Sequence, residues 1–146
     1  SAEPDVIPAG DGAIGYMATT FNGVGTDYPI YTQLQDLYEQ GKGTAGSFDD
    51  TGNVLYSRGL LNAAYIVEAV KTAQAKYGNR AMTGAEVRWG FENLNITDAR
   101  IKELGLTGLM PPVKVTCENH EGQNPGAYFQ QWDGKKWNIK TDWVQR

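Results

Sequence analysis

The stretch NVLYSRGLLNAAYIVEAVKTAQAKY, residues 53–77, carries the strongest helix signal in the chain and decides how the remainder is interpreted. Its apolar residues recur at helical spacing, and Gly78 follows as a residue that tolerates the left-handed backbone at a helix end. The expected apolar stripe consists of Tyr56, Leu60, Ala64, Val67 and Val70, widened by Leu61, Tyr65 and Ala69. The expected polar side carries Arg58, Glu68, Lys71 and Lys76. A helix with so broad an apolar face needs a sheet or other helices to cover it.

Three further helices are expected, over residues 29–40, 83–94 and 97–104. Pro29 suits the first turn of the first of them, and Gly41 stops it. Its apolar positions are Ile30, Leu34, Leu37 and Tyr38. Thr83 and Glu86 have the spacing of a capping box, and Thr97 is a good N-cap for the last helix. The chain is therefore rich in helices that present apolar faces.

Strands are fewer and shorter than the helices require. Residues 14–21 and 113–117 are expected strands, and residues 128–132 and 136–139 form a predicted hairpin around Asp133-Gly134. Residues 1–12, 22–27 and 43–50 are expected to be irregular. None of the strands is the continuous Val/Ile-rich run of a central parallel strand. The sequence therefore predicts an α/β fragment that lacks the main parallel strands of its sheet.

Composition excludes several classes of function. The chain has 146 residues and a net charge of -4, with no run of Lys or Arg, which argues against a nucleic-acid surface. No apolar stretch approaches the roughly 20 residues of a membrane helix. The pattern GxGxxG at residues 10–15 precedes a strand instead of following one, so it is a poor dinucleotide fingerprint. Nucleophile-elbow, zinc-protease and P-loop motifs are lacking, and we expect neither an enzyme nor a cofactor.

Several motifs, taken in order, resemble one family. They are GDGAIGYMATTF at 10–21, YSRG at 56–59, LMPP at 109–112, CENH at 117–120 and QWDGKKW at 131–137. Together they resemble the C-terminal portion of type I periplasmic solute-binding proteins of the leucine/isoleucine/valine (branched-chain amino-acid) family of ABC transporters. The resemblance extends over essentially the whole chain.

The resemblance implies a two-lobed architecture with Rossmann-like lobes and solute bound in the cleft between them. By analogy, residues 1–24 and 121–146 belong to the C-terminal lobe and residues 25–120 to the N-terminal lobe. Segments 22–27 and 118–126 are then two of the crossovers between lobes. The implied partners are an amino acid, amide or aromatic acid, the membrane permease of an ABC importer, and the missing N-terminal half of the same protein. The implied location is the periplasm, which an exported protein reaches by means of a signal peptide.

The same resemblance suggests ligand-binding residues. Tyr56 and Arg58 lie at the start of the long helix, where Arg58 could clamp a carboxylate and Tyr56 could cover an apolar group; the alternative places Tyr56 in the core and Arg58 in solvent. Phe21 and Asn22 end a strand at a crossover, where hinge packing competes with solute contact. His120, the only histidine, lies beside the other crossover.

No metal site is expected. Cys117 is the only cysteine and is expected to be a small buried side chain without a partner at metal spacing. Glu118 and Glu121 are weak candidates to join His120 in a site, and a hinge or surface hydrogen bond is the default role of the imidazole. Trp132, Trp137 and Trp143 are expected to pack the hairpin in preference to forming a sugar platform.

Two alternative functions remain open. One is a cytoplasmic amide or amino-acid sensor on the same fold. The other is a small acid/base enzyme that uses His120 with Glu118 or Glu121. The first differs from an importer component in its location, and the second predicts turnover.

Overall fold

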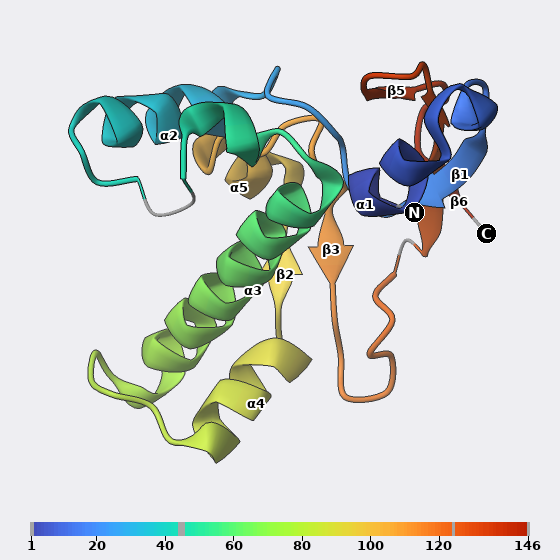
Figure 1. Ribbon diagram of the computed structural model, residues 1–146. Coiled ribbons are helices and arrows are strands. Elements are labelled where there is room, and N and C mark those ends of the chain that lie inside the picture. Colours follow the sequence, from blue (N-terminus) through green and yellow to red (C-terminus); the bar gives the residue numbers. More distant parts are fainter. Residues whose placement is uncertain (1, 44–45, 124, 146) are drawn as a thin grey trace.

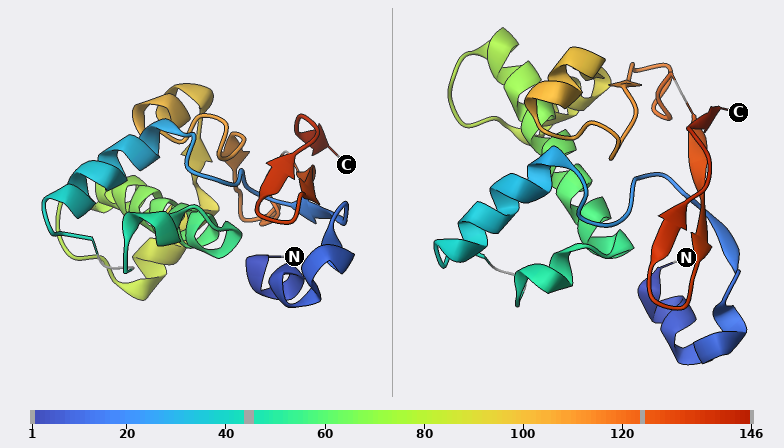
Figure 2. Two further views of the ribbon diagram at one scale, coloured as in Figure 1. Left: turned by 45° about the horizontal axis from the view of Figure 1, so that its top comes forward. Right: turned by 90° about the horizontal axis from the view of Figure 1, so that it is seen from above.

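The computed structural model describes residues 2–43, 46–123 and 125–145, which form two parts (Figures 1 and 2). The strand part contains α1 (Glu3–Val6), the 3-10 helix η1 (Ile7–Ala13), β1 (Met17–Thr20), β4 (Gly126–Trp132), β5 (Trp137–Ile139) and β6 (Val144–Gln145). The helical part contains α2 (Pro29–Glu39), η2 (Phe48–Thr51), α3 (Val54–Tyr77), α4 (Gly84–Glu92), β2 (Asn95–Ile96), α5 (Asp98–Glu103) and β3 (Val113–Lys114). Positions 44–45 of the predicted loop 43–50, and position 124 of the predicted crossover 118–126, lie outside the described residues.

The long helix α3 has the bounds that the sequence predicts. The side chain of Asn53 caps it by accepting a hydrogen bond from the backbone N–H of Tyr56 at 2.8 Å. At the other end the N–H of Gly78, which has a φ of 96°, donates to the carbonyl of Gln74 at 2.9 Å. The capping box of Thr83 and Glu86 is also present at the start of α4.

The buried face of α3 matches most of the predicted apolar stripe and departs from the prediction at Val67 and Glu68. Val67, expected in the apolar stripe, is 53% exposed, and Glu68, expected on the polar side, points inward. The buried positions are Val54, Ser57, Leu61, Ala69 and Ala73. On the C-terminal half of the helix α4 packs tightly, with Gly90 against the backbone of Ala69. The predicted stripe was therefore wrong at Val67, whereas Leu60, Leu61, Ala64, Tyr65 and Ala69 lie in or against the core of the helical part, as predicted.

The helical part has its own apolar core, formed by α3, the β2–β3 ladder, α5 and the turn after α5. Its buried side chains are Leu61, Ala69, Leu94, Ile96, Ile101, Leu106, Leu109 and Met110. At its edge the guanidinium of Arg100 on α5 donates two hydrogen bonds to the carboxylate of Glu68 on α3, at 2.9 and 2.7 Å. These bonds hold the pKa of Glu68 below its usual range, although partial burial opposes the shift.

The strand part is organised around β4, which pairs antiparallel with β1, β5 and β6. The predicted hairpin is confirmed: Trp132 lies opposite Trp137, with ring centroids 5.5 Å apart, and Gly134 in the turn has a φ of 99°. Both tryptophans are buried, and Trp143 packs edge-on against Tyr128. The aromatic side chains of the hairpin therefore pack the strand part, as the sequence predicts.

Four local predictions need correction. Residues 48–50 of the predicted loop 43–50 belong to the 3-10 helix η2. Residues 3–13 form short helices, with a kink at Gly10, instead of an irregular segment, because Pro4 and Pro8 carry the fixed φ of a first helical turn. The strand predicted over 14–21 is confined to β1, since Gly15 at a φ of 87° cannot extend it. The strand predicted over 113–117 is confined to β3, and the chain turns at 116–119.

The two parts are joined twice. The chain leaves the strand part after β1 and returns to it at β4, and these two strands pair along four residues. Both described chain ends lie in the strand part (Figure 2). Every strand pair among the described residues is antiparallel.

One side of α3 remains uncovered, with Leu55 49%, Ile66 52% and Val67 53% exposed. Within the described residues, none of the helices has the length and hydropathy of a membrane span.

Candidate functional site

A pocket of about 420 Å³ lies where the helical and strand parts face each other. Its lining is mainly apolar and comes from both parts, with three titratable side chains, those of Tyr65, His120 and Glu121. It consists of Phe21, Tyr65, Phe91, Leu94, Pro111, Val113, Val115, His120, Glu121, Pro125, Gly126 and Trp143. The volume lies within the range of small-molecule sites. Burial raises the pKa of Tyr65 in the wall, so this phenol stays neutral near pH 7.

Both segments that connect the two parts contribute to this pocket. Phe21 follows β1 on the first segment, and its side chain is 67% exposed. His120 and Glu121 lie on the second segment, before β4. The structure therefore brings Phe21 and His120, two residues selected from the sequence, to one pocket.

Asn22, the neighbour of Phe21, does not line this pocket. It is buried, and its side-chain amide donates to the carbonyl of Gly23 at 2.7 Å. Its backbone carbonyl accepts from the hydroxyl of Thr20 at 3.1 Å. These contacts fix the direction in which the chain leaves β1, which is a structural role at the connection.

Tyr56 and Arg58 lie apart from the pocket, near the N-terminal end of α3. The ring of Tyr56 packs near that of Tyr31, with centroids 6.4 Å apart, and Arg58 is exposed. The backbone N–H of Val54, in the first turn, already donates to both carboxylate oxygens of Glu3, at 3.2 and 3.1 Å. A carboxylate from this chain thus occupies the position that favours an anion.

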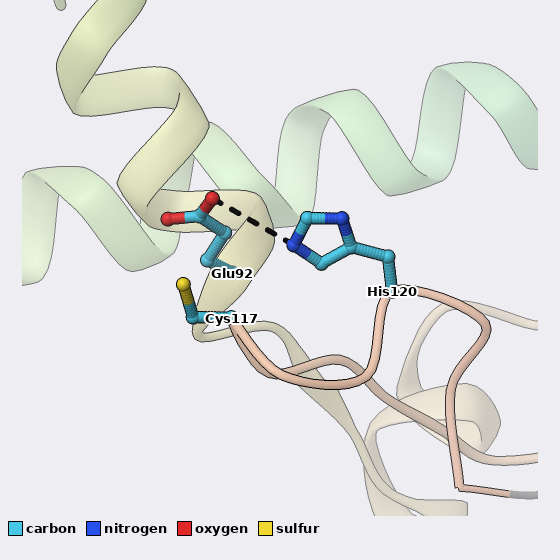
Figure 3. Close-up of side chains that lie close together, drawn as sticks. All are labelled: Glu92, Cys117 and His120. Carbon is cyan, nitrogen blue, oxygen red and sulfur yellow. Dashed lines mark ion pairs between the residues drawn. The ribbon is translucent and has the colours of Figure 1, made fainter.

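His120 has a neighbour that the sequence did not suggest. Its Nε2 lies 3.7 Å from Oε1 of Glu92 at the end of α4, and Cys117 lies beside them (Figure 3). Ligand atoms of these three residues all lie within 4.8 Å of one another. Cys117 is exposed, so its predicted burial was wrong. The expectation that it lacks a partner at metal spacing was also wrong, because Cys117 and His120 are three residues apart and converge in space.

The pocket combines an apolar wall with polar groups. Its apolar wall would take an aliphatic or aromatic group, and His120 and Glu121 supply polar contacts at one end. Among the described residues, the carboxylate that forms an ion pair with His120 is Glu92, not Glu118 or Glu121. That carboxylate also accepts a hydrogen bond from Nε of Arg88 at 2.8 Å.

Two solved structures are similar to this chain. One is a crystal structure described as an ABC transporter permease from the Pseudomonas fluorescens group, with 44% identity and a TM-score of 0.93 over 99% of this chain and 35% of that chain. The other is a branched-chain amino acid ABC transporter from Thermus thermophilus with bound valine, with 20% identity and a TM-score of 0.69 over 100% of this chain and 37% of that chain. No protein-family profile and no curated protein matches.

The chain thus spans about a third of the length of each of these structures. The expected mixed α/β fold is confirmed as the fold of part of a larger chain. The second likeness, at 20% identity, concerns the fold alone.

Proposed function

We propose that this chain is part of the solute-binding component of an ABC importer. In this proposal residues 1–24 and 121–146 belong to one lobe and residues 25–120 to the other. The solute, an amino acid, amide or aromatic acid, binds between the lobes without being chemically changed. The proposed location is the periplasm, and the proposed partner is the membrane permease of the importer.

The observation that carries this proposal is the pocket between two parts that are joined by two segments. Each segment contributes a side chain to the pocket wall, Phe21 from one and His120 from the other. A rotation of one part about these segments would widen or narrow the pocket, as in hinge closure around a ligand. The likeness to two chains described as ABC transporters supports the assignment to this transport system.

The uncovered side of α3 supports the proposal that the rest of the protein is needed. Leu55, Ile66 and Val67 lie in solvent at about half exposure, on a helix whose other side is packed. Large exposed apolar areas commonly mark contact surfaces. We assign this side of α3 to the remainder of the longer chain, which the proposal places N-terminal to residue 1.

A thermal-shift screen of the intact protein with amino acids, amides and aromatic acids tests the proposal. Binding raises the melting temperature in a manner that depends on ligand concentration. Phe21→Ala should reduce the shift caused by the preferred solute, whereas Leu37→Ala, at an exposed position on α2 outside the pocket, should not. Absence of any stabilising solute in a broad panel would count against a binding role.

A further inference from the structure

We propose that Glu92, Cys117 and His120 form a site for a divalent transition-metal ion of the zinc type. The proposal goes beyond solute binding and does not depend on it. The three ligand atoms come from two places in the chain, the last residue of α4 and the turn after β3. Neither α4 nor the turn after β3 needs a carboxylate, a thiol and an imidazole at these positions in order to fold.

The geometry is close to that of a coordination sphere. Zinc binds thiolate sulfur at about 2.3 Å and imidazole nitrogen or carboxylate oxygen at about 2.0–2.2 Å, which places neighbouring ligand atoms about 3.3–3.6 Å apart in a tetrahedron. Nε2 of His120 and Oε1 of Glu92 are 3.7 Å apart, and no pair among the three ligand atoms exceeds 4.8 Å. Small rotations of the exposed Cys117 and His120 side chains toward Glu92 are therefore enough to close the site.

The ligand set favours zinc over magnesium or calcium. Thiolate and imidazole are ligands of zinc and its neighbours in the first transition row, whereas the harder cations prefer oxygen. Three protein ligands leave a fourth position for water. His120, with its side chain 62% exposed, keeps the site accessible from solvent.

The turn that carries two of the ligands is held by its own hydrogen bonds. The backbone N–H of Asn119 donates to the hydroxyl oxygen of Thr116 at 3.1 Å, and the side-chain amide of Asn119 donates to the carbonyl of Gly122 at 3.1 Å. Oδ1 of Asn119 accepts from the N–H of Glu121 at 3.2 Å. The backbone that carries Cys117 and His120 is thus held in place before a metal binds, which lowers the entropy that binding must overcome.

A cysteine nucleophile is the competing interpretation of the same residues. A relay of cysteine, histidine and carboxylate uses the two imidazole nitrogens for two different partners. Here the Nε2 edge of His120 faces both Glu92 and Cys117 (Figure 3). Two groups that converge on one nitrogen are placed as fellow ligands of an ion, and this placement favours the metal site.

Cobalt(II) titration of the reduced intact protein tests the site, because thiolate coordination gives a charge-transfer absorbance and tetrahedral geometry gives visible bands. We expect one equivalent to bind with both signals and zinc to displace it. Cys117→Ser should abolish the charge-transfer band. His120→Ala and Glu92→Gln should each weaken zinc binding at least about tenfold.

Glu118→Gln is the matched control, since Glu118 lies in the same turn but outside the cluster, and it should leave the affinity unchanged. Circular dichroism of each variant checks its fold. If Glu92→Gln unfolds, the variants at Cys117 and His120 still test the site, because these two residues are exposed and their replacement should not disturb the fold. The proposal is overturned by wild-type protein that binds no cobalt stoichiometrically. It is also overturned by His120→Ala that binds as tightly as wild type, since the thiol alone would then account for the metal.

Discussion

Gly90 of α4 lies against the backbone carbonyl of Ala69 on α3, so closely that a methyl group on Gly90 would overlap that oxygen. The same methyl group would also lie 2.9 Å from the carbonyl carbon of Ala69 and 3.3 Å from Cβ of Ala73. The backbone cannot yield as a flexible side chain can. The absence of a side chain at position 90 therefore sets the distance between the two helices.

Gly90→Ala should destabilise the chain by about 1–3 kcal/mol, because the helices must separate to admit the methyl group. Gly59→Ala is the matched control, since Gly59 is exposed on α3 and a methyl group there meets nothing within 4 Å. In the 146-residue chain it should stabilise by about 0.5–1 kcal/mol through helix propensity. Urea unfolding measures the change in the free energy of unfolding for both variants. Equal changes for Gly90→Ala and Gly59→Ala would contradict the close packing of the two helices.

Glu68→Gln should destabilise by about 1–2 kcal/mol, because it removes charge-assisted hydrogen bonds from Arg100 that link α3 to α5. The two side chains are only 12% and 29% exposed, so solvent screens them little. Lys71→Gln removes an exposed partner 3.9 Å from the same carboxylate and should change stability by less than about 0.5 kcal/mol. A Lys71 effect as large as that of Glu68 would contradict this assignment.

Acid should destabilise the chain below pH 4.5. Hydrogen bonds from Arg80 hold the pKa of Glu86 at about 2, and the backbone N–H of Lys136 contributes most to lowering the pKa of Asp133 to about 2. A lowered folded-state pKa gives stability that is present above the unfolded value and is lost as pH falls through the folded one. The double variant Glu86→Gln, Asp133→Asn should lose less stability than wild type between pH 4.5 and 2, measured by urea unfolding at each pH. An unchanged pH dependence would contradict these shifts.

The uncovered side of α3 gives a prediction that compares two forms of the protein. Ile66→Ala should change the stability of the 146-residue chain by less than about 0.5 kcal/mol, since Ile66 is 52% exposed. In the intact protein it should cost about 2–5 kcal/mol, because the remainder of the chain covers this side. Lys102→Ala, on the exposed side of α5, should be nearly neutral in both. An equally small Ile66 effect in both forms would show that nothing covers α3.

The sequence predicts elements better than it predicts faces. The ends of α3 were predictable because Asn53 caps it and Gly78 stops it, and both are local signals. The burial of Ala73 and the exposure of Val67 were not, because the residues that a helix buries depend on its neighbours, here on α4, whose Gly90 packs against Ala69. The ladder between β2 and β3 was also missed, since two-residue strands leave no alternation to detect.

The candidate sites show the same division. Phe21 and His120 were selected from their places at the two crossovers, and they do line one pocket. Tyr56 and Arg58 were selected because they lie at the start of a helix, where an anion could bind. The carboxylate of Glu3, which is distant in sequence, already accepts hydrogen bonds from the N–H of Val54 at that helix start. The Cys117 and His120 spacing was present in the sequence; Glu92 was not recognisable as their neighbour, because only the fold brings α4 to the turn after β3.

Calorimetric titration of solute into the intact protein tests the central proposal most directly. We expect saturable binding of one amino acid, amide or aromatic acid per molecule, with a negative heat-capacity change from burial of apolar surface. We also expect binding at least about tenfold weaker by the 146-residue chain alone, which carries only part of the proposed cleft. An intact protein that binds none of these solutes, or an isolated chain that binds as tightly as the intact protein, would contradict it.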